Sequence, residues 1–289
     1  MIHVFPDTDA WGRHLARAAG ASCARVRVHR FPDGESLVRV RAPAGREAIL
    51  VRSLHDPNAK LVEVLLAADA LRRAGARRVT LVAPYLAYMR QDAVFRPGEP
   101  VSQRAIGACL ARAFDRVLTV EAHLHRVRRL ADAVSRPSRS LSAAPAIAAW
   151  VRRTGADLLV GPDAESAPWL RAVGCAAGLP WVVGAKARLG DDRVRIRLPG
   201  VRPARRAVIV DDVSSSGATL ATAARALRRA GVARVEAVVV HALFAPGALA
   251  RLRAAGITRV VSCDTIPHPT NAIATAALVA AALQTRCSG

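Results

Sequence analysis

Residues 207–220, with the sequence AVIVDDVSSSGATL, indicate the fold of this 289-residue chain. The stretch begins with a β-branched apolar run, continues with Asp211 and Asp212, and then has small residues from Ser214 to Thr219. An Ala-rich periodic segment follows, so the order predicts a buried strand, a tight loop and a helix. Strands that alternate with helices form parallel sheets with covered faces, so we expect an α/β fold.

The loop in this stretch has the chemistry of a phosphate site. Hydroxyls, a glycine and the free N–H groups of a helix N-terminus suit a phosphate, because donors and helix dipole both face the anion. The two carboxylates are placed to accept hydrogen bonds from sugar hydroxyls, or to hold a metal through water. The alternative is an ordinary turn with a serine N-cap, but two adjacent acids would then repel each other to no purpose.

The stretch resembles the phosphoribosyl-diphosphate (PRPP) binding loop of type I phosphoribosyltransferases and ribose-phosphate pyrophosphokinases. The usual loop has Asp-Thr-Gly where this chain has Ser215-Ser216-Gly217, and commonly a second glycine at Ala218. Ser216 keeps a hydroxyl, whereas Ser215 removes a charge near the ribose. The resemblance implies a ribose 5-phosphate site made by Asp211, Asp212, Ser215, Ser216, Gly217, Ala218 and Thr219.

Composition excludes several classes of protein. The chain is 52% apolar, yet it has no run approaching the ~20 apolar residues of a membrane span, so we expect no membrane partner. Five scattered cysteines without a Cys-x-x-Cys pair predict a reduced, cytoplasmic protein. The formal charge of +21 could indicate nucleic-acid binding, but 4% aromatic residues offer few stacking platforms. We therefore expect no nucleic-acid partner and interpret the arginine excess as biased composition plus phosphate ligands.

The chain contains an internal repeat. ALRRAGARRV begins at Ala70 and ALRRAGVARV at Ala226, each reading as a helix end, a glycine stop and the start of a strand. The repeat predicts two similar halves, and the linker-like residues 136–144 place the boundary near residue 145, giving domains 1–145 and 146–289. The N-terminal copy of the loop, SLHDPNAKL from Ser53, lacks the acid pair and the glycine. Only the C-terminal half should therefore retain the phosphate site.

Two further segments follow predicted strands in the N-terminal half. FPDGE at residues 31–35 alone predicts an ordinary hairpin turn. YLAYMRQDAVFRPGEPVS at residues 85–102 places Arg90 and Arg96 beside amide and carboxylate groups. Because guanidinium groups bind phosphate bidentately, this segment fits a nucleoside triphosphate better than a solvated loop.

These segments, in this order, extend the resemblance to the ribose-phosphate pyrophosphokinase family over nearly the whole chain. The length and the forms GPDAESAPW and GAKARLG are similar to the compact archaeal-type members. The resemblance implies two similar phosphoribosyltransferase-like domains, each a mainly parallel sheet flanked by helices, in a homodimer or larger homo-oligomer. It also implies transfer of diphosphate from ATP to the 1-hydroxyl of D-ribose 5-phosphate, giving PRPP and AMP. ATP would be bound by Phe31, Asp33 and Glu35 of a neighbouring subunit and by Arg90, Gln91 and Asp92 of the same chain.

A third constellation, VEAHLH at residues 120–125, suggests a divalent cation, since His123 and Glu121 combine imidazole with carboxylate. A capping or buried histidine is the alternative. The resemblance places a Mg²⁺-associated histidine at His123, although the family usually has Asp where this chain has Glu121. It also nominates Asp163 as a metal residue in GPDAES, where simple helix capping explains Ser166 equally well.

Lys186 and Arg188 lie on a Gly-bounded turn in a chain with only two lysines. A basic hairpin tip is the plain interpretation, whereas the resemblance makes them catalytic cations on a flap that meet the transferring phosphoryl group. Three rival functions stay open. They are a PRPP-using salvage phosphoribosyltransferase, a non-catalytic regulatory member of the same family, and a nucleic-acid binder.

Overall fold

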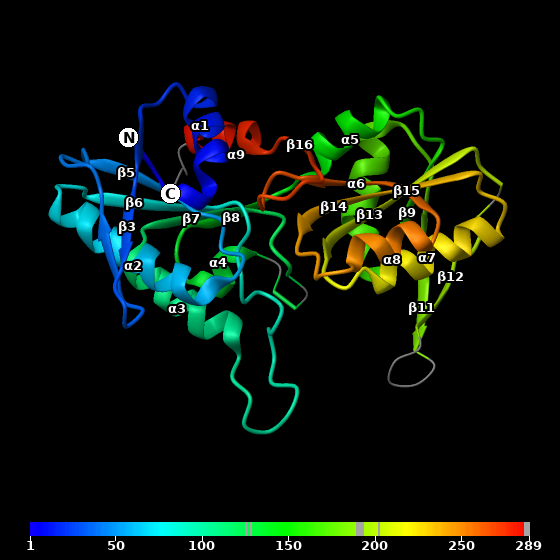
Figure 1. Cartoon of the computed structure of the whole chain (residues 1–289), viewed down its shortest axis with the longest axis horizontal. Helices are drawn as coiled ribbons and strands as arrows, with labels where there is room; N and C mark the ends of the chain where they lie inside the picture. The colour runs from blue at the N-terminus through cyan, green and yellow to red at the C-terminus, as the bar shows by residue number, and fades with distance from the viewer. Residues whose placement is uncertain (125, 128, 189–193, 202, 286–289) are drawn as a thin grey trace. The chain divides into compact units, whose positions relative to one another are not determined.

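The computed structural model describes residues 1–124, 126–127, 129–188, 194–201 and 203–285, with residues 186–188 and 194–195 described by their backbone alone. The chain forms two compact units (Figure 1). Unit 1 is Met1–Leu141 together with the segment from Thr275 onward, and unit 2 is Ser142–Ala274. We predicted one division near residue 145 with all later residues in the second domain; in the structure the chain returns to unit 1 at Thr275.

The sheet of unit 1 has six strands in the order β2-β1-β5-β6-β7-β8. All neighbouring strands are parallel. The strands are β1 (Ile2–Val4), β2 (Cys23–Arg25), β5 (Glu47–Val51), β6 (Arg78–Ala83), β7 (Arg116–Val120) and β8 (Ser138–Leu141). A separate antiparallel hairpin of β3 (Arg27–Arg30) and β4 (Ser36–Arg39) confirms the predicted turn at residues 31–35.

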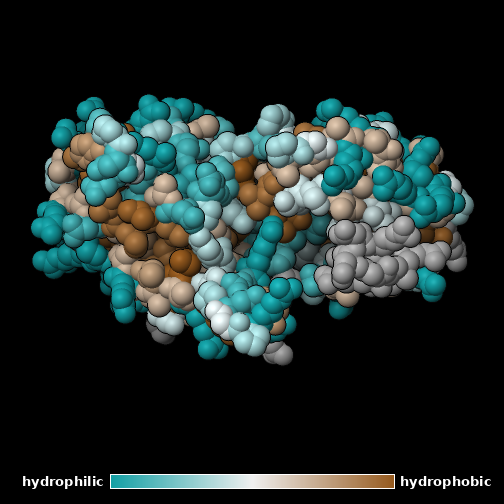
Figure 2. All heavy atoms as spheres, turned by 60° about the horizontal axis from the view of Figure 1, so that its bottom comes forward, coloured by the Kyte–Doolittle hydropathy of each residue, from teal (hydrophilic) through white to brown (hydrophobic). Residues whose placement is uncertain are grey.

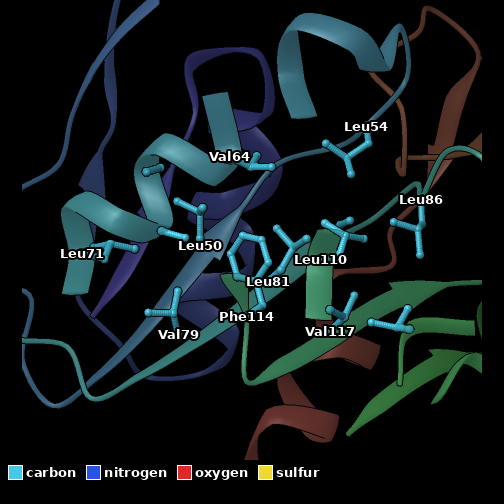
Figure 3. Packing of buried hydrophobic residues seen from close by; sticks show 14 of the residues in the cluster. Leu50, Leu54, Val64, Leu71, Val79, Leu81, Leu86, Leu110, Phe114 and Val117 are labelled. Carbon is cyan, nitrogen blue, oxygen red and sulfur yellow. The ribbon is translucent and has the colours of Figure 1, made fainter. Parts of the chain in front are cut away.

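Helices cover both faces of this sheet (Figure 1). One face carries α1 (Asp9–Ala18), which follows the 3-10 turn η1 (Pro6–Thr8), and α9 (Ala276–Gln284). The other face carries α2 (Pro57–Arg73), α3 (Ser102–Ala113) and α4 (Leu130–Val134). Figure 3 shows apolar residues of the strands, among them Leu50 and Leu81, facing Val64 and Leu71 of α2 and Leu110 of α3 across the core. All five are 0% exposed, so the sheet is anchored by a tightly buried apolar layer.

The C-terminal helix packs on unit 1 because α1 and α9 contact each other directly. Trp11 Nε1 of α1 donates a hydrogen bond to Thr275 Oγ1 at 3.1 Å, next to the start of α9. We predicted this helix over residues 272–283; it begins later because Asn271–Ile273 forms the edge strand β16.

The sheet of unit 2 repeats the first, with the order β10-β9-β13-β14-β15-β16 and parallel neighbours throughout. Its further strands are β9 (Leu158–Gly161), β10 (Trp181–Val183), β13 (Arg206–Ser214), β14 (Arg234–Ala242) and β15 (Ile257–Cys263). Its helices are α5 (Ala144–Arg152), α6 (Ala167–Ala177), α7 (Ala218–Arg229) and α8 (Ala248–Ala254), with the 3-10 turn η2 (Ala164–Ser166) before α6. A hairpin of β11 (Ala185–Arg188) and β12 (Val194–Arg197) occupies the place that β3 and β4 have in unit 1.

The two units therefore share one connectivity, and the predicted repeat is confirmed at the level of hydrogen bonds. The N–H of Ala76 donates to Leu71 O at 3.0 Å after α2, and the N–H of Val232 donates to Leu227 O at 3.1 Å after α7. The residue before each donor, Gly75 or Gly231, has a φ of 100° or 83°. Both repeats thus end their helix with the same glycine-dependent turn.

We predicted that residues 136–144 are linker-like, but part of this stretch is a strand of the sheet. Residues 138–141 form β8, whose backbone pairs with β7, and Ser140 Oγ accepts a hydrogen bond from Ala122 N at 2.7 Å. A segment rich in serine can serve as an edge strand when one side of its backbone is paired. No helix among the described residues combines the length and the apolar character that crossing a membrane requires.

Candidate active site

The loop between β13 and α7 has the geometry predicted for an anion site. Gly217 is the N-cap of α7 with a φ of 73°, and a Cβ added there would lie 3.1 Å from Leu252 Cδ2. Glycine is thus required both by the left-handed backbone and by the close approach of α8. The loop is held from outside, since Ser216 O accepts from Arg251 at 2.9 Å and Ser215 O accepts from Ala245 N at 3.1 Å. The first N–H groups of α7 follow this loop, where Ala218 N donates to Ser216 Oγ at 3.3 Å, and a helix N-terminus of this kind suits a phosphate.

The acid pair lies on β13, just before the loop as predicted, although the strand continues past it to Ser214. The strand extends to Ser214 because β14 continues to pair with it, with Asp211 opposite Val239. Pairing with β9 on the other side ends at Ile209. Asp211 and Asp212 are half-buried where β13 projects past β9, and Asp212 N donates to Asp211 Oδ1 at 3.1 Å. Both acids therefore lie at the carboxyl edge of the sheet, beside the loop that begins at Ser215.

Asp163 lies at the same edge, directly after β9. Its Oδ1 accepts a hydrogen bond from Glu165 N at 3.2 Å, so it caps η2. Ser166 is 2% exposed and donates to Asp163 O at 2.6 Å. A Cβ at Gly161 would lie 2.1 Å from Ser166 Oγ. Ser166 is thus packed into the turn and is the N-cap residue of α6, but its hydroxyl caps no N–H group of that helix, so the capping explanation for its side chain is wrong.

The β11–β12 hairpin of unit 2 carries Lys186 and Arg188. Lys186 pairs with Ile196 and Arg188 with Val194 across the two strands. The side chains of both cations, and the tip at residues 189–193, lie outside the described residues. Their catalytic role stays a prediction.

The turn assigned to ATP joins β3 and β4 and is ordered by its own hydrogen bonds. Phe31 N donates to Glu35 O at 2.8 Å, Gly34 N donates to Phe31 O at 2.9 Å, and Asp33 Oδ1 accepts from Glu35 N at 3.1 Å. The Phe31 ring is 40% exposed and meets the His29 ring edge-on at 4.9 Å. The turn therefore presents an aromatic ring and two carboxylates to its surroundings.

The structure brings the segment at residues 85–102 together with the loop that carries His123. Asp92 Oδ1 accepts from the Arg126 guanidinium at 2.6 Å, and Asp92 Oδ2 accepts from Arg126 N at 3.0 Å. Burial raises the pKa of Asp92, but these hydrogen bonds and the charge of Arg126 outweigh it and hold the pKa below its usual value. The Asp92 side chain is 0% exposed, so it ties the two loops together, and an ATP contact by this carboxylate would compete with Arg126.

Arg90 is exposed and Gln91 half-buried on the same segment. Gln91 is oriented by α3, since its Oε1 accepts from Ser102 Oγ and its carbonyl oxygen accepts from Gln103 N at 3.1 Å. The role of these two residues as ATP ligands stays a prediction.

The loop after β7 contains the predicted metal residue His123, which is half-buried. The neighbouring Glu121 has a φ of 40°, and its N–H donates to Leu141 O at 2.9 Å. His125 lies outside the described residues. The part of the chain that the structure describes contains no group of three or more His, Cys, Asp or Glu side chains able to hold a metal by themselves.

In unit 1, the position equivalent to the phosphate loop is filled by an internal ion-pair cluster. Asp56, the N-cap of α2, has a left-handed φ of 49°, and Gly217 before α7 is left-handed too, with a φ of 73°. Lys60 Nζ lies 3.0 Å from Asp7 Oδ2 and 3.0 Å from His55 Nε2. Burial, followed by the charge of Lys60, lowers the pKa of His55 to about 4. The basic groups here are thus occupied by the chain's own side chains, which supports our prediction that only the C-terminal half retains the phosphate loop.

Sequence reasoning missed three residues that hold loops of the site: Arg126, Arg251 and Glu63, which accepts a hydrogen bond from Ser36 Oγ at 2.8 Å beside the turn at residues 31–35. Each acts on a loop far from it in sequence, so spacing carries no signal. The rarity of lysine, which drew attention to Lys186, could also have found Lys60, but not its partner Asp7. Asp7 follows Pro6 after β1, and Asp163 follows Pro162 after β9. This repeated Pro-Asp pair after a strand is a signal in the sequence by which Asp7 could have been found.

The family model for the N-terminal domain of ribose phosphate pyrophosphokinase matches residues 5–113, and the model for the phosphoribosyl transferase domain matches residues 131–278. The ribose-phosphate pyrophosphokinase of Methanopyrus kandleri is 36% identical over 94% of this chain and 94% of its own. The ribose-phosphate pyrophosphokinase 2 of Archaeoglobus fulgidus is 34% identical over 95% of this chain and 97% of its own. The crystal structure of phosphoribosylpyrophosphate synthetase from Mycobacterium smegmatis shares the fold, with a TM-score of 0.86, 24% identity and coverage of 98% and 97%. With two matching domain models in order and similar relatives along its whole length, this chain belongs to the ribose-phosphate pyrophosphokinase family.

Proposed function

We propose that the chain is a ribose-phosphate diphosphokinase, which converts ATP and D-ribose 5-phosphate into AMP and PRPP. The observation that carries this proposal is the anion loop of unit 2, with the acid pair and Asp163 beside it at one sheet edge. The 1-hydroxyl oxygen of the ribose bonds to the β-phosphorus of ATP as the bond from that phosphorus to the α-phosphate oxygen breaks. AMP is the leaving group, and the hydroxyl proton passes to solvent.

Ribose 5-phosphate binds at the β13–α7 loop. Its phosphate accepts hydrogen bonds from the serine hydroxyls and from the N–H groups at the start of α7. Asp211 and Asp212 accept hydrogen bonds from the ribose hydroxyls. The residues that make up this site are Asp211, Asp212, Ser215, Ser216, Gly217, Ala218 and Thr219.

The residues that we assign to ATP belong to unit 1, and the two catalytic cations belong to unit 2. The exposed Arg90 and the adjacent Gln91 contact ATP within one chain, and Asp92 holds the loops around them through Arg126. Lys186 and Arg188 neutralise charge on the diphosphoryl group. Because such transfer depends mainly on positioning and electrostatic stabilisation, no covalent intermediate with the protein is required.

The carboxylate of Asp163 fits Mg²⁺, which prefers oxygen ligands and commonly takes only one or two protein carboxylates beside substrate phosphates and water. Asp163 offers such a carboxylate at the edge of unit 2, and His123 lies in the loop after β7 of unit 1. The ion would supply neutralisation of phosphate charge. Asp163 and His123 are the residues we assign to it.

We further propose that the protein acts as a homo-oligomer in which the turn at residues 31–35 completes a neighbour's ATP site. This turn belongs to the unit whose own loop is filled by ion pairs. Figure 2 shows hydrophobic surface gathered on the first unit, and its hairpin and α2 expose large apolar side chains. These are Phe31, Leu37, Val62 and Leu66. A cytoplasmic location fits the four described cysteines, none of which takes part in a disulfide.

The experiment that tests the function measures AMP formation from ATP with and without ribose 5-phosphate. We expect AMP and PRPP in equal amounts, and only when both substrates and Mg²⁺ are present. Binding of ATP without any AMP would instead favour a non-catalytic regulatory member. Consumption of added PRPP with a purine base, without use of ATP, would favour a salvage phosphoribosyltransferase.

A further inference from the structure

A buried carboxylate in α2 holds the turn that the proposed function assigns to ATP. Glu63 is 1% exposed, and no step of the proposed reaction uses it. Its Oε1 accepts a hydrogen bond from Ser36 Oγ at 2.8 Å and lies 3.5 Å from the Arg30 guanidinium. Its Oε2 accepts from the Arg52 guanidinium. A buried charge is costly unless it is paired, and these contacts pair both oxygen atoms of the carboxylate.

The two residues that reach Oε1 enclose the turn. Arg30 and Ser36 are directly opposite each other in the register of β3 and β4, and only residues 31–35 lie between them. One oxygen atom therefore contacts both ends of the turn. The hydrogen bonds within residues 31–35 define the shape of the turn, whereas this contact defines its direction relative to α2.

The other side of Glu63 is anchored to the sheet through Arg52. This arginine directly follows β5, is 5% exposed, and lies over the Phe5 ring at 4.1 Å. Its Nε is 3.3 Å from Asp7 Oδ2. Burial raises the pKa of Glu63, but hydrogen bonds from Arg52 and Ser36 and the nearby guanidinium charges lower it further than burial raises it. The carboxylate stays ionised and links the sheet to the hairpin.

β3 and β4 form a two-stranded sheet of their own, which packs Val28 and Val38 against the core of unit 1, and Glu63 adds a polar link beside the turn. A two-stranded hairpin is marginally stable in water by itself. We propose that Glu63 is a positioning residue, which holds the turn at residues 31–35 in the direction required to contact ATP. This inference rests on the proposed function for the identity of the ligand. A turn that is not held must be ordered when ATP binds, so its release lowers ATP affinity and leaves ribose 5-phosphate binding unchanged.

Four variants separate this role from a general contribution to stability. Ser36→Ala removes the 2.8 Å hydrogen bond and leaves Glu63 paired with Arg52, while Ser36→Thr keeps the hydroxyl on a strand that suits threonine. Glu63→Gln keeps the shape of the side chain and removes its charge. The matched control is Arg72→Gln at the other end of α2, which breaks a 3.0 Å ion pair with Asp115 and does not touch the hairpin.

The test combines hydrogen exchange of residues 26–40 in the intact protein with steady-state kinetics for both substrates. For Ser36→Ala and Glu63→Gln we expect faster exchange in the turn and a KM for ATP raised by about threefold to tenfold. The KM for ribose 5-phosphate and kcat should stay within about twofold of wild type, which a loss of general stability would not achieve. Ser36→Thr should behave like wild type, and Arg72→Gln should leave both exchange and the KM for ATP unchanged.

The inference is overturned by unchanged exchange in the turn, by an unchanged KM for ATP, or by a parallel rise of both KM values. If the wild-type protein forms no AMP at all, the proposed function fails on its own. Exchange rates and the Kd for ATP from calorimetry then decide the role of Glu63 without reference to turnover.

Discussion

The buried His3 should make unit 1 sensitive to acid. It lies in the middle of β1, is 0% exposed, and neither of its ring nitrogens has a hydrogen-bond partner among the described residues. Burial, followed by the charge of the N-terminal ammonium group, lowers the pKa of His3 from 6.5 to about 4. The folded protein thus keeps the imidazole neutral at a pH where the unfolded chain already binds a proton.

The sign and size of the effect follow from this difference in pKa. The contribution of neutral His3 to stability is fully present above pH 6.5 and is lost as the pH falls toward 4. For these two pKa values, a change from pH 7 to pH 5 costs about 2 kcal/mol, and the full loss below pH 4 is about 3 kcal/mol. The variant His3→Leu removes the titrating group and two unpaired nitrogen atoms from the core. We therefore expect it to be at least as stable as wild type at pH 7 and clearly more stable at pH 5.

The measurement is urea unfolding followed by tryptophan fluorescence at pH 7 and pH 5. The free energy of unfolding of wild type should fall by about 2 kcal/mol more than that of His3→Leu between these pH values. His14→Gln serves as the control, since His14 is an exposed histidine of α1. It should lose as much stability as wild type. An equal loss in His3→Leu and wild type would refute the reasoning.

Three further predictions concern the active site. Lys186→Ala should lower kcat by about 100- to 1,000-fold with little change in KM, because the charge of Lys186 acts mainly in the transition state. Turnover within about threefold of wild type would contradict the flap role of Lys186. Asp211→Asn and Asp212→Asn should each reduce ribose 5-phosphate affinity or turnover in steady-state assays, while calorimetry shows the same or a slightly higher Tm, since one like charge is removed. Unaltered kinetics in both variants would refute the sugar-binding role. A mixture of Phe31→Ala and Lys186→Ala proteins should regain part of the activity through hybrid sites, whereas full activity of a monomer seen by light scattering would exclude a shared site.

Local sequence was enough to predict the units of this fold. The strand, loop and helix around Gly217 were predicted because a β-branched run, small residues and an Ala-rich period are each local signals. The duplication was predicted because ALRRAGARRV and ALRRAGVARV encode the same helix stop, and the structure shows the same hydrogen bond after each. The FPDGE hairpin was predicted for a similar reason, since Gly34 supplies a φ of 92° within five residues.

Contacts between distant segments were not predictable in this way, because a hydrogen bond or ion pair between them leaves no mark on the spacing of either. Residues 138–141 were predicted as part of a linker. In the structure they form a strand, because their backbone pairs with β7. Residues 271–273 likewise became strand β16 through pairing with β15, which delayed the start of α9.

The same limit applies to the candidate site. The residue types at Asp92, Lys60 and Glu63 were visible in the sequence, but their partners Arg126, Asp7 and Ser36 come from other elements. Local patterns therefore predicted which groups could bind phosphate, sugar and ATP. Tertiary packing decided which of the charged groups are left to face a ligand and which are neutralised inside the protein, because burial makes an unpaired charge too costly to keep.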